Sequence, residues 1–273
     1  MDKKIADELW YWYLMGEWRT EPPGNMPLLL QVSSACFKYI PSDPHCFECG
    51  KPMAGIGGNL LRFMGSKPSS FSPKLCSACE MTIREQESGA EVELTMLFAD
   101  VRGSTPLAER STTSEYKELI QKFYKETSNV LIEHNAMVNR LMGDQVIALF
   151  VPRFAGKDHA KVALHTAKEL LRVTGHANPA GPWIPVGIGI HTGRAYVGTV
   201  GSASGVNEIA VLGSAANLCA RLSSRAAAGE ILISEDSVKS GNLDASGLES
   251  RPLELKGISK PVSVKMSKVG TAD

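Results

Sequence analysis

Two lone aspartates, each beside an apolar run, are the residues of this chain best placed to do chemistry. The run ending at Phe98-Ala99 delivers Asp100 into the small-residue turn Gly103-Ser104-Thr105, where backbone N–H groups can face phosphate oxygens. Further along, Asp144 follows Gly143 and precedes a second apolar run. Two carboxylates on the ends of neighbouring strands can hold two divalent cations over a nucleoside triphosphate. Either aspartate alone would more simply cap a turn, so the interpretation depends on residues downstream.

An amide and a guanidinium downstream are spaced to share one helix face. Asn217 and Arg221 lie four residues apart in the segment after Leu212-Gly213-Ser214. These groups suit a ribose hydroxyl and a negative charge that develops on phosphorus. Without the two aspartates, a surface hydrogen bond between the two side chains would explain them as well.

Four of the six cysteines form two Cys-x-x-Cys pairs, Cys46 with Cys49 and Cys76 with Cys79. Each pair can donate two thiolates from one tight turn, and four thiolates suit tetrahedral Zn²⁺. The same ligand set also binds iron–sulfur clusters, so zinc and a redox-sensing cluster both remain open. Residues 36–88 are therefore predicted to form a small metal-bound module with short helices.

From Ala90 onward, alternating strand-like and helix-like segments must position these polar residues. Strand patterns cover 92–101, 136–141, 146–151, 184–191, 195–201 and 230–234, and helical spacing covers 114–134, 157–174 and 215–226. The second and third of these strands form a hairpin that turns at Gly143-Asp144. The β-α-β-β-α-β order predicts an α+β fold of the ferredoxin-like type, extended at its C-terminal end.

The segment before the cysteine pairs contains an aromatic cluster at residues 10–13. We predict a short helix, a turn and a second short helix at residues 28–30. The cluster is expected to pack on the cysteine module or across a dimer rather than on a membrane, because basic residues do not accompany it. The predicted organisation is a helical segment at 1–35, the metal-binding module at 36–88 and a catalytic domain at 89–268.

The composition excludes several classes of partner. Lys plus Arg equals Asp plus Glu, 29 of each, so no nucleic-acid partner is predicted. No stretch approaches the roughly 18 to 20 apolar residues that span a bilayer. The charged N-terminus leads into no cleavable apolar segment. We therefore expect a cytoplasmic protein without a transmembrane segment, in which cysteines are thiols or metal ligands rather than disulfides.

Four separated blocks together resemble a class III adenylate/guanylate cyclase domain of the bacterial type with an N-terminal Cys-rich module. The blocks are Phe98 to Thr105, Gly143-Asp144 with Ala148-Leu149-Phe150, Gly187 to Val200, and Leu212 to Leu222. The resemblance covers roughly residues 92–268, and it is specific because the blocks occur in the family's order and spacing. Any single block would be weak.

The resemblance implies roles for the matching residues. Asp100 and Asp144, with the Val101 backbone, would hold two Mg²⁺ or Mn²⁺ ions. The expected phosphate contacts come from Val101, Arg102, Gly103 and Ser104. Asn217 would orient the ribose, and Arg221 would stabilise charge at the α-phosphate.

The implied reaction is the conversion of ATP, or GTP, to the 3′,5′-cyclic nucleotide and pyrophosphate. Positioning and electrostatics supply most of the catalysis. The resemblance further implies a homodimer in which one subunit gives the metal-binding aspartates of a site and the other gives Asn217 and Arg221. The cysteine module precedes the first catalytic strand and is expected to regulate the dimer.

Three positions depart from the family's pattern. Arg140 stands where adenylate cyclases usually carry a base-reading Lys. Ala210 replaces the usual Asp or Thr and cannot accept a hydrogen bond from an exocyclic amine. Ile258 replaces a second phosphate-binding Lys, a role for which Lys256 or Lys260 would have to substitute.

These departures leave two interpretations open. One is an active cyclase of relaxed or altered base selection, for which ATP is favoured over GTP only because the family mostly uses it. The other is a catalytically silent domain that binds nucleotide or dimerises. Retention of both aspartates, the asparagine and the arginine favours activity, since a decayed site has no physical reason to keep all four.

Overall fold

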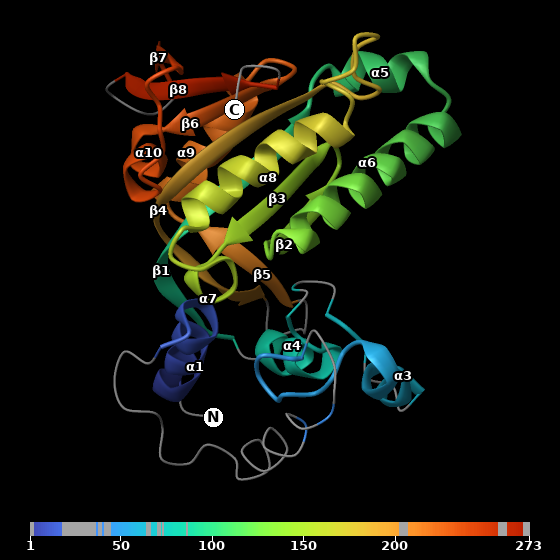
Figure 1. The fold of residues 1–273 in the computed structure, drawn as a ribbon, viewed down its shortest axis with the longest axis vertical. Coiled ribbons are helices and arrows are strands. Elements are labelled where there is room, and N and C mark those ends of the chain that lie inside the picture. The colour runs from blue at the N-terminus through green and yellow to red at the C-terminus, as the bar shows by residue number, and fades with distance from the viewer. Residues whose placement is uncertain are drawn as a thin grey trace. The chain divides into compact units, whose positions relative to one another are not determined.

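The computed structural model describes residues 3–17, 37, 40, 45–63, 67–69, 72, 74–85, 87–201, 207–255 and 261–269 (Figure 1). The chain divides into two compact units. The first comprises Met1–Val92, Pro152–Phe154 and Tyr196–Val211, and the second comprises Glu93–Val151, Ala155–Ala195 and Leu212–Asp273.

An 8-stranded sheet has the strand order β2-β3-β1-β4-β6-β8-β7, and β5 pairs with β4 outside this path. The strands are β1 (Gly89–Val101), β2 (Met137–Met142), β3 (Gln145–Phe150), β4 (Val186–Gly201), β5 (Asn207–Leu212), β6 (Glu230–Ser234), β7 (Glu249–Leu253) and β8 (Val262–Lys268). The order β2-β3-β1-β4, with one long helix after β1 and another after β3, is the ferredoxin-like βαββαβ arrangement. The predicted fold class is confirmed.

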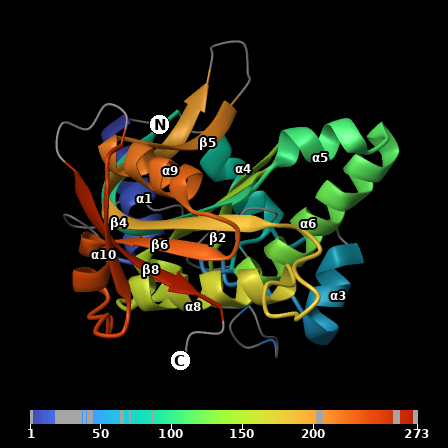
Figure 2. The same ribbon diagram turned by 90° about the horizontal axis from the view of Figure 1, so that it is seen from above.

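The second unit carries helices on both faces of its part of the sheet. Its helices are α5 (Ser104–Arg110), α6 (Thr113–Glu133), α8 (His159–Val173), α9 (Ser214–Arg225) and α10 (Glu235–Ser240). Ile231 and Ile233 of β6 belong to the large core under α6 and α8, whereas Leu232 packs in a smaller core with Leu222 of α9. Because successive strand residues point to opposite faces, α8 and α9 must cover opposite faces, as Figure 2 shows.

Strand β4 is one continuous strand, so the prediction of two separate strands at 184–191 and 195–201 was wrong. The glycines of this segment serve close packing rather than a break in the strand. A Cβ built on Gly189 would lie 2.3 Å from the backbone nitrogen of Ser223 in α9. Glycine is therefore required for α9 to lie directly on β4, and this contact fixes the helix that carries Asn217 and Arg221.

Local signals gave the long helices correctly. α6 matches the helix predicted at 114–134, and its N-terminus is a capping box in which Thr112 and Glu115 bond reciprocally. α8 matches the helix predicted at 157–174. Helices α5 and α10 and strands β5, β7 and β8 were not predicted. The second short helix predicted at residues 28–30 lies outside the described residues.

The first unit contains the short helices α1 (Lys3–Met15), α3 (Gly55–Phe63) and α4 (Ser77–Arg84), and α7 (Pro152–Ala155) begins in it. Two rings of the aromatic cluster, Trp10 and Tyr13, are buried, with their centroids 5.9 Å apart. Tyr13 also meets the ring of Phe154 edge-on at 5.4 Å. Among the described residues, no helix is both long and apolar enough to cross a bilayer.

A buried chain of side-chain hydrogen bonds crosses the second unit. Its members, in order, are His159, Thr95, Thr192, Ser237, Ser234 and His191. The five bonds between them need five protons, of which the four hydroxyls supply four. One histidine Nδ1 must therefore donate while the other accepts, and the two rings cannot both be imidazolium without loss of a bond.

Stability should consequently depend on pH through these histidines. Burial lowers the pKa of His159 and of His191 below the ordinary 6.5, although nearby carboxylates act in the opposite direction. Above that value both folded and unfolded rings are neutral. As the pH falls through about 6.5, the two histidines bind protons in the unfolded chain but stay neutral in the folded chain. The free energy of unfolding therefore decreases.

A substitution that keeps the acceptor tests this dependence. We expect His191→Asn, whose amide oxygen can still accept from Ser234, to reduce the slope of unfolding free energy against pH by up to about 1.4 kcal/mol per pH unit. Urea denaturation at about pH 7.5 and about pH 5.5 measures the slope. The exposed His165→Asn is the control and should keep the wild-type slope. An unchanged slope in His191→Asn would contradict the expectation.

Candidate functional site

The two aspartates lie at the ends of neighbouring strands. β1 pairs antiparallel with β3, and Asp100 stands opposite Gln145, the residue that follows Asp144. The backbone N–H of Val101 donates to the carbonyl oxygen of Asp144 at 2.9 Å. The pairing of β1 with β3 therefore places the two carboxylates at the same end of two neighbouring strands.

Each aspartate is held by a glycine turn. The β2–β3 hairpin turns at Gly143-Asp144, as predicted, and Gly143 has φ 63°, a conformation that glycine adopts without strain. Gly103, which follows β1 and precedes α5, has φ 68°. The hydroxyl of Tyr124 donates to the Gly143 carbonyl at 2.8 Å and so braces the hairpin from α6. This supporting tyrosine was missed, because nothing in the sequence spacing relates position 124 to position 143.

The carboxylates have polar partners that the sequence did not reveal. Arg102 forms an ion pair with Asp100, and its Nε donates to the Asp100 carbonyl at 3.2 Å. The hydroxyl of Ser104 donates to a carboxylate oxygen of Asp144. Burial raises the pKa of Asp100; Arg102 acts against this and the charge of Asp144 adds to it.

This donor set fits hard divalent cations. Carboxylate oxygens are the ligands that Mg²⁺ and Mn²⁺ prefer, and a cation between Asp100 and Asp144 would offset the mutual repulsion that helps to raise the Asp100 pKa. Two of the four amides expected to contact phosphate are engaged in the fold. Val101 N–H bonds to Asp144, and Arg102 N–H bonds to the Pro185 carbonyl at 2.8 Å.

A hollow of about 500 Å³ opens beside Asp144. It is lined by Ser104, Thr105, Ala108, Glu109, Tyr116, Gly143 and Asp144. Burial, followed by the charge of Asp144, raises the pKa of Tyr116, so its hydroxyl stays protonated and can donate. The hollow is polar at the carboxylate and open to a ligand.

Asn217 and Arg221 lie on one side of α9, as predicted. Asn217 is exposed and Arg221 is half-buried. Within the part of the chain that the structure describes, neither side chain has a hydrogen bond or ion pair, with the aspartates or with any other residue. The turn after Asp100 does reach the other end of α9, where Arg102 Nη1 donates to the Ser224 carbonyl at 3.2 Å.

The positions expected to select the base belong to different units of the chain. Arg140 is half-buried on β2, opposite Ile147, next to a register shift in the β2–β3 pairing. Ala210 lies on β5 in the first unit and is half-buried. Lys256 lies outside the described residues.

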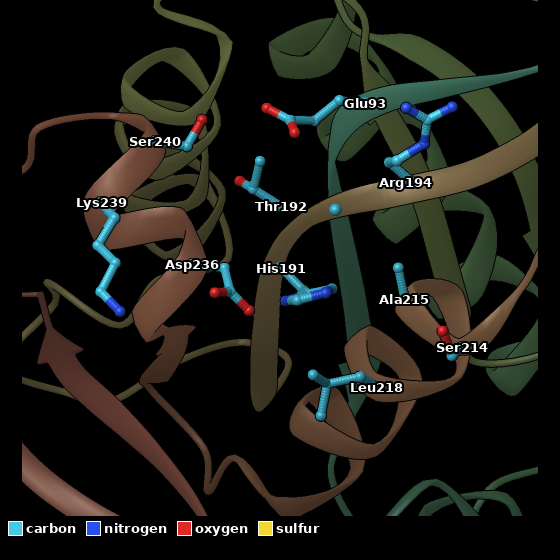
Figure 3. Close-up of a pocket in the computed structure, with 11 residues that line it drawn as sticks. Glu93, His191, Thr192, Arg194, Ser214, Ala215, Leu218, Asp236, Lys239 and Ser240 are labelled. Atoms are coloured by element: carbon cyan, nitrogen blue, oxygen red, sulfur yellow. The ribbon is translucent and has the colours of Figure 1, made fainter.

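A second hollow, of about 750 Å³, opens where β1, β4, α9 and α10 meet (Figure 3). Its lining includes Glu93, Arg194 and Asp236, and Asp236 lies beside His191 in Figure 3. Ser214 and Ala215 bring the first turn of α9 to its wall. The aspartate pair is not among its lining residues, so this hollow is separate from the one beside Asp144.

The four predicted cysteine ligands come together in the first unit. Cys46, Cys49, Cys76 and Cys79 are buried thiols, and their Sγ atoms all lie within 4.8 Å of one another. The first pair turns tightly, with Gly50 N–H bonded to the Cys46 carbonyl at 2.8 Å. The second pair begins α4. The backbone N–H of Cys76 points at the Sγ of Cys46 at 3.3 Å.

The geometry of the four sulfurs fits a metal ion. Cys49 Sγ and Cys76 Sγ are 3.7 Å apart, and thiolates bound at tetrahedral Zn–S distances lie about 3.8 Å apart. The hydrogen bond with Cys49 lowers the pKa of Cys46, which favours the thiolate form that a metal ion binds. Next to it, burial raises the pKa of Glu48 to about 7.

Comparisons with known proteins identify the family of the region that contains the site. The family model described as "Adenylate and Guanylate cyclase catalytic domain" matches residues 87–267. An adenylate cyclase of Anabaena cylindrica is 26% identical over 185 residues, which is 63% of this chain and 36% of that protein. Adenylate cyclase 1 of Rhizobium meliloti is 29% identical over 135 residues, 48% of this chain and 20% of that protein.

Solved structures show the same fold. The guanylyl cyclase Cya2 superposes with a TM-score of 0.59 at 27% identity, covering 67% of this chain and 95% of that one. The adenylyl cyclase CyaB from P. aeruginosa gives 0.57 at 25% identity, covering 66% and 95%. Named adenylate and guanylate cyclases both occur among these proteins, so the comparisons leave the base preference open.

The chain spans only 36% and 20% of the two curated relatives named above, whereas the family model covers more than half of the chain itself. The matched region contains Asp100, Asp144, Asn217 and Arg221, and it begins after the four cysteines. The chain therefore belongs to the adenylate and guanylate cyclase catalytic domain family.

Proposed function

We propose that the protein is a homodimeric purine nucleotidyl cyclase that converts ATP, or GTP, to the 3′,5′-cyclic nucleotide and pyrophosphate. The observation that carries this proposal is the pairing of β1 with β3, which brings Asp100 and Asp144 together beside a hollow. Asn217 and Arg221 supply the second half of the site from a second copy of the chain. Their lack of partners among the described residues supports this arrangement.

Each residue has a role that follows from its chemistry. Asp100 and Asp144 would hold two Mg²⁺ or Mn²⁺ ions, which lower the pKa of the ribose 3′-hydroxyl and neutralise the triphosphate when bound. The amides at Gly103 and Ser104, without a backbone partner among the described residues, are available to phosphate oxygens. Asn217 orients the ribose, and the guanidinium of Arg221 stabilises charge at the α-phosphate.

Base selection rests on fewer groups than usual. The methyl group of Ala210 cannot accept from the adenine amine, and Arg140 can donate to either purine. We propose ATP as the preferred substrate with relaxed discrimination against GTP, because a pocket that lacks a hydrogen-bond partner for the base loses most of its power to reject the wrong one.

The organisation into a segment at 1–35, a metal module at 36–88 and a catalytic domain at 89–268 is part of the proposal. The four cysteines hold Zn²⁺ in this view. The closeness of all four sulfurs supports a single ion over an iron–sulfur cluster, in which the thiolates would have to bind several separate irons. The module regulates the catalytic domain to which it is joined.

The test is incubation of the purified full chain with ATP and with GTP, each with Mg²⁺ and with Mn²⁺, and identification of the products by mass. We expect both cyclic nucleotides, with more cyclic AMP. Cyclic AMP alone would mean that adenine is selected although residue 210 cannot accept a hydrogen bond. Neither product, from protein whose cysteine site is loaded with metal, would contradict the proposal in favour of a silent regulatory domain.

A further inference from the structure

The three residues that follow Val151 after strand β3, Pro152–Phe154, leave the second unit and pack within the first. Arg153 is the centre of this contact, and its side chain is only 9% exposed. Its Nη1 donates to the Trp12 carbonyl at 2.9 Å, and its guanidinium carbon stands 3.7 Å from the centre of the Trp12 ring. A buried arginine that stacks and bonds on one tryptophan is rigidly placed.

The other side of the guanidinium contacts the turn of the first cysteine pair. Arg153 Nη2 donates to the Phe47 carbonyl at 3.3 Å and lies 3.9 Å from a carboxylate oxygen of Glu48. Phe47 and Glu48 are the two residues between Cys46 and Cys49, so Arg153 contacts both residues of the turn that sets the spacing of these two thiols.

A second set of contacts holds the same turn. The ring of Phe47 lies 5.8 Å from that of Phe154, and Lys74 Nζ lies 4.9 Å from the centre of the Phe47 ring. Lys74 Nζ also donates to the Phe154 carbonyl at 3.3 Å, while Phe47 N–H donates to the Lys74 carbonyl at 2.9 Å. The segment after β3 and the cysteine turn are therefore bound to each other through two cations.

The charge of a metal-bound four-cysteine site explains why Arg153 and Lys74 lie beside the Cys46–Cys49 turn. Four thiolates around one divalent ion carry two net negative charges, which are costly in a buried site unless nearby positive groups compensate. A guanidinium stays protonated when buried and can bond to two acceptors at once, whereas an ammonium acts as a point charge. Arg153 is suited to this task by its type as well as by its place.

We propose that Arg153 is a positioning residue of the four-cysteine metal site, which orients the Cys46–Cys49 turn and balances the charge of the bound ion from the segment that follows β3. Binding of the ion and anchoring of that segment then stabilise each other by the same free energy. The role of Arg153 at the metal site does not depend on the cyclase activity. It gives the module a physical link to the strand that begins directly after Asp144.

The test measures metal retention rather than turnover. Full-length protein is loaded with Zn²⁺, and the rate of zinc transfer to a chromogenic chelator is compared among variants. We expect Arg153→Gln to release zinc about 10- to 100-fold faster than the wild type, the usual effect of losing a group that supports metal ligands. Arg153→Lys, which keeps the charge but not the two bonds, should be intermediate. Arg172→Gln, which removes a surface ion pair with Glu169 on α8, should release zinc at the wild-type rate.

A purely structural arginine would give a different result. The melting temperatures of zinc-loaded and chelated protein are compared for each variant, because coupling requires that zinc stabilises Arg153→Gln less than it stabilises the wild type. Equal stabilisation by zinc in both proteins would overturn the proposal. Wild-type release rates in Arg153→Gln would also overturn it, provided that Cys49→Ser releases zinc rapidly in the same assay.

Discussion

Replacement of Asp144 by asparagine should abolish cyclic nucleotide formation while the fold and the dimer persist. An amide is a poor ligand for a divalent cation, and the loss of several kcal/mol of charge stabilisation corresponds to a fall in turnover of roughly a thousand-fold or more. The hairpin should survive because Val101 bonds to the backbone of Asp144, not to its side chain. The amide oxygen can also still accept the proton of Ser104.

The melting temperature distinguishes loss of metal binding from unfolding as the cause of lost activity. The negative charge of Asp144 raises the pKa of the half-buried Asp100, so its removal relieves a repulsion rather than creating one. We expect the melting temperature of Asp144→Asn to stay within about 3 °C of the wild type. Asp244→Asn, at an exposed loop aspartate bonded to Ser246, is the matched control and should keep full activity. Undiminished turnover in Asp144→Asn would refute the assigned role.

Local chemistry explains what the sequence predicted well. The Gly143-Asp144 turn, the capping box at Thr112 and the four-residue spacing of Asn217 and Arg221 depend on residues that are neighbours in the chain. The two Cys-x-x-Cys pairs also came together as predicted; the turn within each pair is local, whereas the approach of Cys49 to Cys76 joins residues 27 apart in the chain. Features of this kind can be predicted from the spacing of residues along the chain.

The features that were missed depend on contacts between distant residues. Strand β4 was predicted as two strands, at 184–191 and 195–201, although its glycines serve the approach of α9, an element that comes later in the chain. The Tyr124 hydroxyl of α6 donates to the Gly143 carbonyl of the β2–β3 turn, and Arg153 donates to the carbonyl of Phe47, which is 106 residues away in the chain. Each depends on the packing of elements, which composition and periodicity do not encode.

The proposed division of the site between two copies of the chain leads to the second large effect. Asp144→Asn and Asn217→Ala should each be nearly inactive alone, because every site of either homodimer lacks one group. When the two variants are co-expressed with different tags, mixed dimers form. Each mixed dimer has one site with both defects and one with none.

Activity should therefore return in the mixture. With equal expression, half of the dimers are mixed and each retains one of two sites, so the expected specific activity is about a quarter of the wild type.

The control mixture is Asp144→Asn with Asp100→Asn. Both defects then lie in the same half of the site, so each site of a mixed dimer keeps one of them and activity should not return. Equal recovery in the two mixtures, or none in either while tag pull-down shows mixed dimers, would contradict a shared site. Recovery only in the first mixture would require that Asn217 acts on the aspartates of a second copy. This is consistent with the exposure of Asn217 and with the absence, among the described residues, of a hydrogen bond between it and the aspartates of its own chain.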